Sequence, residues 1–381
     1  MTRANWQKLL TMLFLSAVWF GIGWQAHAKV APTAVPPEVA RIAKAGQLIL
    51  TRAYPSTPLQ ADELADAAIR GMLRFTEDRY AALYTGPAQE RYAADFAGET
   101  GAPGLWYNYQ DGNFVISAVR ANGPAAAAGV QIGDIIRAVD GLAVNELTSG
   151  HEIAMILRGP IGVAVPLTVQ RGEQTRTMQV QREEREQLRS RLLDTGVGYV
   201  RLPSFPTGVA QSLKAEVIAL QSQGMQALVL DMRNNAGGST HDAAAILNFF
   251  IQQGNFYTAE FKDGQRRTIS ADGAAFLPDL PLTVLVDGGS FSSTELITAA
   301  LQDHRRATII GSTTGGKGTI QDTIPLDDHA LLHFTIAKWL SPAGHWVHQQ
   351  GIHPNVTIVD DPTTPNDEVI DVALAQMQGG S

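Results

Sequence analysis

Short apolar runs and amphipathic stretches alternate along the second half of the sequence. A continuous apolar run at 227–230 and mostly apolar runs at 282–286 and 307–311 predict buried strands, because a strand covered on both faces needs no polar alternation. A further strand is expected at 198–202. After it, apolar side chains gather on one helical face, at Val209, Leu213, Val217 and Leu220. This alternation of strands and helices predicts an α/β (α+β) core.

The preceding part of the sequence shows two other patterns. Residues 37–98 are predicted to be helical, since apolar positions recur there at helical spacing, and they contain no catalytic pattern. Residues 104–171 combine strand patterns with turn signals and include a capping box formed by Ser149 and Glu152. We expect a packing or docking segment followed by a separate small domain.

The N-terminal residues have the pattern of a targeting segment. Arg3 and Lys8 precede an apolar run, and Ala26-His27-Ala28 provides a small-x-small cleavage site. We predict a signal peptide over residues 1–28 rather than an uncleaved membrane anchor, because the run is short for a complete span. The sequence contains no cysteine, which excludes lipid attachment, disulfides and thiolate chemistry. We therefore expect a periplasmic protein, with an inner-membrane-anchored form facing the periplasm as the alternative.

Composition narrows the function classes. Of the 381 residues, 45% are hydrophobic and 17% are charged, and the formal net charge is −8. These values are typical of a soluble globular protein with two or three domains. No basic stripe is present to neutralise phosphates, so nucleic-acid binding is not expected.

The most informative stretch runs from 284 to 321. A strand leads into the hydroxyl-rich segment Ser290-Phe291-Ser292-Ser293-Thr294-Glu295, which opens an amphipathic helix. Such a turn exposes a serine hydroxyl beside free helix N–H groups. The next strand leads into Gly316-Lys317-Gly318, where a lysine can approach a serine and act as a base if it is desolvated. Taken alone, the two motifs favour a helix cap and a solvated turn lysine over Ser–Lys chemistry.

A second glycine turn follows the strand at 227–230. It reads Asp-Met-Arg-Asn-Asn-Ala-Gly-Gly from Asp231, and Ser239 with Asp242 can cap the next helix. Glycines between a strand and a helix leave backbone N–H groups bare, which suits an oxyanion or a phosphate.

The segment 123–141 reads Gly-Pro-Ala-Ala-Ala-Ala-Gly-Val-Gln-Ile-Gly-Asp-Ile-Ile-Arg-Ala-Val-Asp-Gly and closely resembles the PDZ family. The resemblance implies that the C-terminus of another polypeptide binds by strand addition, with its carboxylate held by N–H groups of a glycine-containing loop. Gly104, Leu105 and Trp106 occupy the position of that loop. Arg158 is a candidate for added charge at the carboxylate, and a structural turn arginine is the equal alternative. For the whole domain the alternative is an inert spacer.

The order of the motifs resembles the C-terminal processing, or tail-specific, peptidases. A PDZ pattern is followed by Asp-x-Arg-x-Asn-x-Gly-Gly from Asp231, by Ser-x-x-Glu from Ser292, and by Gly-Lys-Gly with a glutamine four residues after the lysine, at Gln321. The resemblance extends from Asp78 to Asn355. It implies a crotonase/ClpP-like ββα protease core with an inserted PDZ domain and an N-terminal helical segment.

The resemblance also implies roles for single residues. These are Ser292 as nucleophile, Lys317 as base, Gln321 as the residue that orients the lysine, and the amides of Ser293 and of Gly237 or Gly238 as the oxyanion hole. A lysine can serve as base when burial lowers its pKa, and a neutral amide orients the amine without restoring its charge.

Several positions depart from the pattern of that family. Phe291 stands where a small residue is usual, and Ser293-Thr294 replaces the more common Ala-Ser. Gly315 replaces the aromatic residue that usually precedes Gly-Lys-Gly, and we expect the loss of this packing anchor to loosen the lysine loop. Arg79 and Asn355 also differ from the usual residues. None of these changes removes a reacting group.

Other side chains offer rival sites. Ser290 and Ser293 are alternative nucleophiles and are disfavoured by their spacing from the glutamate. A Ser–His–Asp site would need a histidine near the nucleophile, and His304 is expected at the far end of the same helix. Three histidines near the C-terminus lack the spacing of a zinc motif, namely His345, His348 and His353. We expect neither a metal nor a cofactor.

The sequence thus predicts five parts: a signal peptide (1–28), a linker and helical segment (29–98), a PDZ domain (99–184), a peptidase core (185–360) and a C-terminal helix or tail (361–381). The predicted function is an exported serine endopeptidase that cleaves proteins near an apolar C-terminal tail held by the PDZ domain. Proteins with free apolar C-termini are the expected partners, and an activator, an adaptor or a homo-oligomer stays open. The alternatives are a catalytically degenerate tail-binding or scaffold protein and, as a weaker match, a crotonase-like acyl enzyme.

Overall fold

The computed structural model describes residues 35–360, 364 and 366–379, so the predicted signal peptide lies outside the described residues. The protein divides into a unit that ends at Ala68 and a unit that begins at Ile69. The first unit contains α2 (Pro37–Arg52) and the first half of α3 (Ala61–Phe75), and neither helix has a buried side chain. Among the described residues, none of the helices combines the length and the apolar composition that crossing a bilayer requires.

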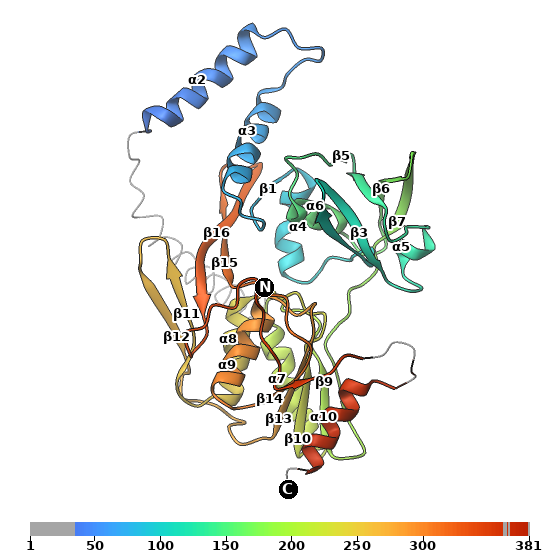
Figure 1. Cartoon of the computed structure of the whole chain (residues 1–381), viewed down its shortest axis with the longest axis vertical. Helices are drawn as coiled ribbons and strands as arrows, with labels where there is room; N and C mark the ends of the chain where they lie inside the picture. The colour runs from blue at the N-terminus through green and yellow to red at the C-terminus, as the bar shows by residue number, and fades with distance from the viewer. Residues whose placement is uncertain (1–34, 361–363, 365, 380–381) are drawn as a thin grey trace, which may run out of the picture. The chain divides into compact units, whose positions relative to one another are not determined.

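In the second unit, one six-stranded sheet lies between helices, with α10 on one side (Figure 1). Its strand order is β17 (Val356–Thr357), β14 (Thr308–Gly311), β13 (Leu282–Val286), β10 (Ala227–Asp231), β9 (Val197–Arg201) and β8 (Arg189–Leu192). All neighbouring strands are parallel except the pair β8 and β9. The strands predicted at 198–202, 227–230, 282–286 and 307–311 are confirmed, each with its ends shifted by at most one residue.

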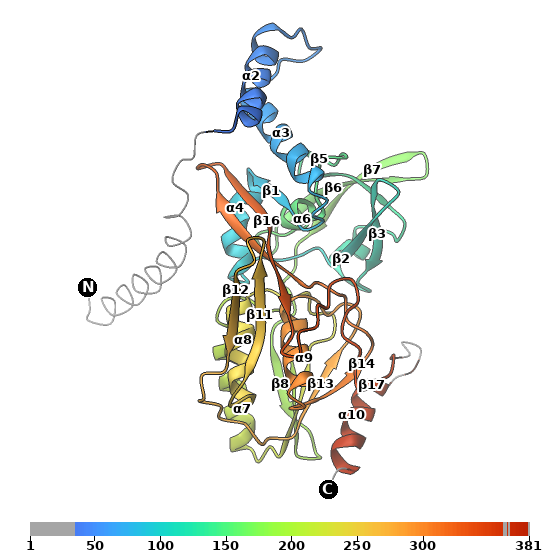
Figure 2. The same cartoon turned by 60° about the vertical axis from the view of Figure 1, so that its left-hand side comes forward.

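Helices cover both faces of this sheet (Figure 2). Alternate side chains of each strand point to opposite faces, so apolar side chains on both faces are buried under helices. One face is covered by α7 (Val209–Ser222), α8 (Thr240–Phe250) and α9 (Ser293–Asp303). The other face is covered by α10 (Glu368–Gly379), whose Val369 and Ala373 pack with Val229 and Leu285 of the sheet. The predicted C-terminal helix is therefore part of the core.

The local pattern does not predict the second sheet, which is antiparallel. In it β16 (Ala330–Leu340) pairs with β1 (Ala82–Thr85), β11 (Asn255–Phe261) and β15 (Thr319–Pro325), and β11 also pairs with β12 (Arg266–Ser270). The prediction that residues 37–98 are helical is wrong at β1, because its side chains are buried by pairing with β16. This pairing joins the segment ahead of the small domain to the β15–β16 hairpin, which carries Gln321.

The third sheet belongs to the small domain that resembles a PDZ domain. Its strands are β2 (Leu105–Gln110), β3 (Asn113–Val119), β4 (Ile135–Val139), β6 (Ala164–Arg171) and β7 (Gln174–Gln181), with β5 (Leu142–Ala143) beside β4. Its helices are α5 (Pro124–Ala127) and α6 (Gly150–Leu157), and α4 (Pro87–Phe96) precedes it. The capping box of Ser149 and Glu152 is confirmed at the start of α6. Within the described residues β2 pairs with β3 alone, which leaves its outer edge open.

Candidate active site

Ser292 lies at the turn between β13 and α9. Its backbone has φ 57° and ψ −115°, a conformation that residues with a side chain rarely adopt. A serine held in this way between a strand and a helix presents its hydroxyl outward, with the first free N–H groups of the helix beside it. The strain therefore falls on the residue that the sequence assigns as nucleophile.

The two neighbouring serines are engaged in structural hydrogen bonds. Ser290 Oγ donates to the carbonyl of Met232 at 2.9 Å, and Ser293 Oγ donates to the carbonyl of Gly238 at 2.8 Å. Both serines are fully buried, whereas Ser292 is partly exposed. The geometry thus favours Ser292 among the three serines.

The glycine turn after β10 lies directly against Ser292. A Cβ built on Gly237 would lie 2.8 Å from Ser292 Cβ and 3.0 Å from Ser293 N, so only glycine permits this approach. The Gly237 N–H donates to Asn235 Oδ1 at 2.9 Å. No acceptor within the described residues takes the N–H of Gly238 or of Ser293. Of the two glycines, Gly238 is therefore the one with an amide available for a ligand.

Lys317 lies in the loop between β14 and β15. Burial lowers the pKa of its amine to about 8, although the carboxylates of Asp78 and Glu295 act in the opposite direction. Lys317 Nζ lies 4.6 Å from the centre of the Tyr80 ring. An amine with such a pKa is neutral in a substantial fraction of molecules near neutral pH and can accept a proton.

Gln321 is held within the β15–β16 hairpin. Its Nε2 donates to Thr319 Oγ1 at 2.9 Å and to Thr335 Oγ1 at 3.1 Å. The backbone N–H of Thr335 in turn donates to Asp78 Oδ2 at 2.8 Å. The structure shows no hydrogen bond from Lys317 Nζ to Gln321 or to Ser292 Oγ among these described residues. Through Thr335, the structure instead connects Gln321 to Asp78, a carboxylate whose charge raises the pKa of Lys317.

Glu295 joins the serine turn to the lysine loop, a role that sequence reasoning did not assign. Its fully buried carboxylate accepts four hydrogen bonds. Oε1 accepts from Thr314 Oγ1 at 2.6 Å and from the N–H of Gly316 at 2.7 Å. Oε2 accepts from the N–H of Ser292 at 2.9 Å and from the N–H of Lys317 at 2.7 Å. The Ser-x-x-Glu motif marks this residue, but three of its four donors come from residues 314–317, a distant segment that the motif does not reveal.

The aromatic ring beside the lysine loop comes from Phe291. A Cβ built on Gly315 would overlap the Phe291 ring, and the Gly315 N–H donates to the carbonyl of Ser290 at 2.9 Å. The expectation that Gly315 leaves this loop without an aromatic anchor is therefore wrong. The two differences from the family pattern, at Phe291 and Gly315, are complementary. The Phe291 ring of the serine turn occupies the space beside Gly315 of the lysine loop.

The predicted tail-binding residues lie at the start of β2. Gly104 has φ 72° and accepts the N–H of Arg120 at 2.9 Å, Leu105 packs against the core of the small domain, and Trp106 is 54% exposed. Arg158 is paired with Asp95 of α4, with its Nη1 2.6 Å from Oδ2. This ion pair gives Arg158 a structural role at the end of α6, and its predicted part in carboxylate binding stays a prediction.

The histidines expected outside the site have other contacts. His304 forms the C-terminal cap of α9, and its Nε2 lies 2.7 Å from the carbonyl of Asn255, so its predicted place at a helix end is confirmed. His353 Nδ1 lies 3.0 Å from Thr313 Oγ1. His348 stacks on Trp346 with ring centres 5.0 Å apart.

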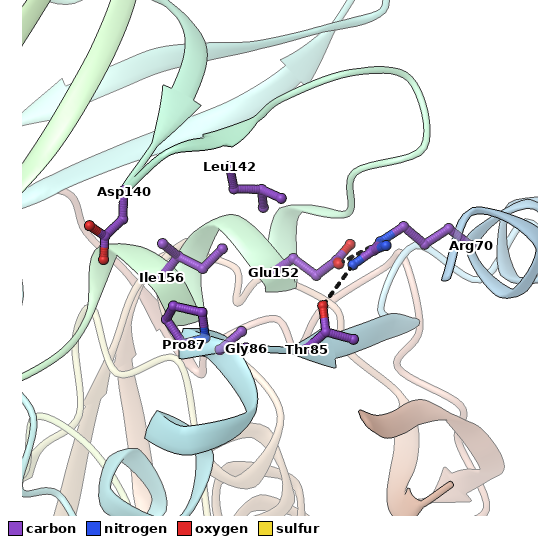
Figure 3. A pocket seen from close by; sticks show the side chains of 9 residues that line it. Arg70, Thr85, Gly86, Pro87, Asp140, Leu142, Glu152 and Ile156 are labelled. Atoms are coloured by element: carbon purple, nitrogen blue, oxygen red, sulfur yellow. Dashed lines mark hydrogen bonds and ion pairs between the residues drawn. The ribbon is translucent and has the colours of Figure 1, made fainter. Parts of the chain in front are cut away.

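A cavity of about 220 Å³ lies away from these residues, between the turn that follows β1 and helix α6 (Figure 3). The Arg70 side chain reaches one end of it, donating from Nε to Glu152 Oε1 at 2.9 Å and from Nη2 to Thr85 Oγ1 at 3.2 Å, and Asp140 lies toward the other end. Its lining contains none of the predicted site residues.

Two family models match separate parts of the sequence. Residues 196–358 match peptidase family S41, and residues 115–171 match the PDZ domain. Ser292, Lys317 and Gln321 all fall within the first match, whereas the segment that contains Tyr80 precedes both.

Relatives and a solved structure agree with these matches. A protein named probable CtpA-like serine protease from Staphylococcus aureus is 31% identical over 301 residues, which cover 78% of this chain and 60% of the relative. A protein of the same name from Staphylococcus haemolyticus is 31% identical over 302 residues, with the same coverage. This chain thus spans about 60% of the length of these relatives.

The structure resembles that of a photosystem II D1 C-terminal processing protease, with a TM-score of 0.63 and 27% identity. The match covers 87% of this chain and 90% of the other. The predicted mixed α/β fold with a PDZ domain is confirmed. The family resemblance seen in the motifs is confirmed as well, since residues 196–358 match peptidase family S41 and a PDZ domain precedes them.

Proposed function

We propose that this protein is a serine endopeptidase of the C-terminal processing type, with Ser292 as nucleophile and Lys317 as general base. One observation carries the proposal. A strained, partly exposed serine and a lysine with a pKa of about 8 are tied together by the buried carboxylate of Glu295. The match to peptidase family S41 and the names of the relatives support the reaction class.

The proposed reaction follows from these positions. Neutral Lys317 takes the proton of the Ser292 hydroxyl while the serine oxygen attacks the peptide carbonyl. The N–H groups of Ser293 and Gly238 stabilise the tetrahedral oxyanion. The Lys317 ammonium then protonates the leaving amine, and an acyl-enzyme remains on Ser292. Lys317 next takes a proton from water, the hydroxide attacks the ester, and the serine is released with its proton restored. Gln321 keeps the hairpin beside the base in place.

The small domain is proposed to capture an apolar C-terminal tail of a protein substrate. Its edge strand β2 is open, and Gly104 turns the backbone just before that strand, as a carboxylate-binding loop requires. The N-terminal sequence supports export to the periplasm, where such a protease would meet exported or misassembled proteins.

A tail-binding protein without peptidase activity is the second candidate. The observation that favours it is that Gln321 is bonded to two threonines and that no hydrogen bond joins Ser292 to Lys317 among the described residues. Catalytic hydrogen bonds are often formed only in the complex with substrate, so the geometry of the free protein is compatible with peptidase activity.

The deciding experiment compares the wild type with Ser292→Ala and Lys317→Ala. The substrate is an unfolded protein with an apolar C-terminal tail, and tail binding is followed by the anisotropy of a labelled peptide. We expect both variants to lose roughly 1,000-fold or more in cleavage rate and to keep the affinity for the peptide. Ser222→Ala and Lys214→Ala on α7 serve as matched controls. Undiminished cleavage by both variants would refute the proposal, and wild-type tail binding without cleavage would establish the second candidate.

A further inference from the structure

We propose that Tyr80 is a positioning residue for the catalytic base, and that its ring covers the Lys317 ammonium and holds it in place. The inference rests on the proposed role of Lys317. Tyr80 lies between α3 and β1, outside the residues that match the peptidase family and outside those that match the PDZ domain. The proposal therefore extends the active site to a segment that precedes both domains.

The contact between the two side chains has the geometry of a cation–π interaction. Lys317 Nζ lies 4.6 Å from the centre of the Tyr80 ring, within the roughly 6 Å over which a ring attracts a cation. Within the described residues the Tyr80 hydroxyl takes part in no hydrogen bond. The ring, rather than the hydroxyl, is the part of Tyr80 that acts on the lysine.

Neighbouring groups fix the ring in this position. His151 of α6 meets it edge-on with ring centres 5.9 Å apart at 75°, and His348 does so at 6.3 Å and 66°. Asp78 fixes the backbone, because its Oδ1 accepts the Tyr80 N–H at 3.0 Å and its Oδ2 accepts the N–H of Thr335 in β16 at 2.8 Å. The ring is held by the small domain, by the antiparallel sheet and by its own turn.

Several charged and titratable groups surround Lys317 and set its titration. They are Asp78, Arg79 and Tyr80 on the turn before β1, Glu295 on α9, His151 on α6, His333 on β16 and His348 on the loop after β16. Burial lowers the pKa of His151 and of His348, and it lowers that of His333 to about 4. These imidazoles are neutral above pH 7, so an activity change near pH 8 reports the amine.

The ring affects the amine in two opposing ways. It excludes water, which disfavours the ammonium, and its negative face attracts the ammonium. Tyr80→Leu keeps the exclusion of water and removes the attraction. Tyr80→Ala removes both and admits water. Tyr80→Phe keeps both. The three variants thus make different predictions from one position.

The experiment measures kcat/KM against pH from 6 to 10 for these variants, with Tyr54→Ala at a fully exposed tyrosine as control. We expect Tyr80→Phe to reproduce the wild-type profile. In Tyr80→Leu the midpoint of the acid limb should fall by about half to one pH unit, with roughly a tenfold loss of kcat. In Tyr80→Ala the midpoint should rise toward the ordinary lysine value of about 10.4.

The proposal would be overturned if the acid limb of the pH profile were unchanged in both Tyr80→Leu and Tyr80→Ala. It would also be overturned if the midpoint shifted equally in all three variants, because the effect would then belong to the hydroxyl. Urea denaturation checks folding, and the apolar bulk of leucine keeps the test valid if the alanine variant unfolds. Lys317→Ala is measured in parallel. If that variant cleaves normally, the proposed function fails; if it is inactive while Tyr80→Leu behaves as wild type, only the role of Tyr80 fails.

Discussion

The two sheets of the peptidase core each provide one half of the candidate site, and the halves are built in different ways. Ser292 lies in the turn between β13 and α9, so the strand, the turn and the helix that position it are continuous in sequence. Lys317 precedes β15 of the antiparallel sheet. The central strand of that sheet, β16, pairs with β1, which precedes the PDZ domain in the sequence. The serine half thus lies on one continuous segment that packs against the neighbouring turn after β10, whereas the lysine half depends on the pairing of strands far apart in sequence. A distortion of those contacts should impair the base before it affects the nucleophile.

Removing the link between the two halves should have the largest effect. Glu295→Gln keeps the size of the side chain but exchanges one acceptor oxygen for an NH2 donor. In one orientation the NH2 faces the N–H of Gly316, and in the other it faces those of Ser292 and Lys317. A buried donor without a partner costs about 1–3 kcal/mol. We expect kcat/KM to fall roughly 100-fold and the free energy of unfolding to fall by about 2 kcal/mol or more.

Steady-state cleavage of the tailed, unfolded substrate and urea denaturation measure these two effects. Glu173→Gln, at an exposed turn of the PDZ domain, is the matched control. Peptide affinity should stay unchanged in both variants, because the PDZ edge strand does not contact Glu295. If Glu295→Gln retained wild-type cleavage, the two halves would not depend on this carboxylate for their alignment.

The pair Phe291 and Gly315 offers a second test of how the halves fit together. Phe291→Ala removes the ring that fills the space above Gly315, and Gly315→Phe alone places a second ring in the occupied space. We expect each single variant to lose about tenfold in kcat/KM, since removing or crowding this ring shifts the turn and the loop that it contacts. The backbone of Gly315 is outside the left-handed region, so a phenylalanine there is not strained by its dihedral angles.

The double variant Phe291→Ala/Gly315→Phe should recover activity to within about threefold of the wild type, because it moves the ring from the turn to the loop. Losses that simply multiply in the double variant would show that the two positions act independently. The same comparison made by urea denaturation separates a packing effect from a catalytic one.

The strands and helices around Ser292 could be predicted from local sequence patterns, whereas those around Lys317 could be predicted only in part. β13 and the strands beside it are marked by largely apolar runs, and the Ser149–Glu152 and Ser239–Asp242 caps are local signals. The pairing of β1 with β16 has no such signal, because antiparallel strands far apart in sequence are matched by register and burial alone. Likewise, Phe291 and Gly315 each looked like a separate departure. Their complementarity became visible only when the turn and the loop met in space.

The smallest expected effect is a change in the free energy of unfolding caused by the buried Lys317. Measuring it tests the lysine half without an activity assay. The Lys317 pKa of about 8 in the folded protein lies below the usual value of about 10.4, so between these pH values the unfolded protein binds more protons and stability rises with pH. Below pH 8 the buried ammonium therefore opposes folding. Lys317→Met should raise the free energy of unfolding at pH 7 by about 1–3 kcal/mol, and its advantage over the wild type should shrink between pH 8 and pH 10. Urea midpoints at pH 7 and pH 10 measure this difference, with Lys214→Met on an exposed helix face as control. Equal stability of Lys317→Met and the wild type at both pH values would mean that the amine is hydrated in the folded protein, and a hydrated lysine could not serve as the base near neutral pH.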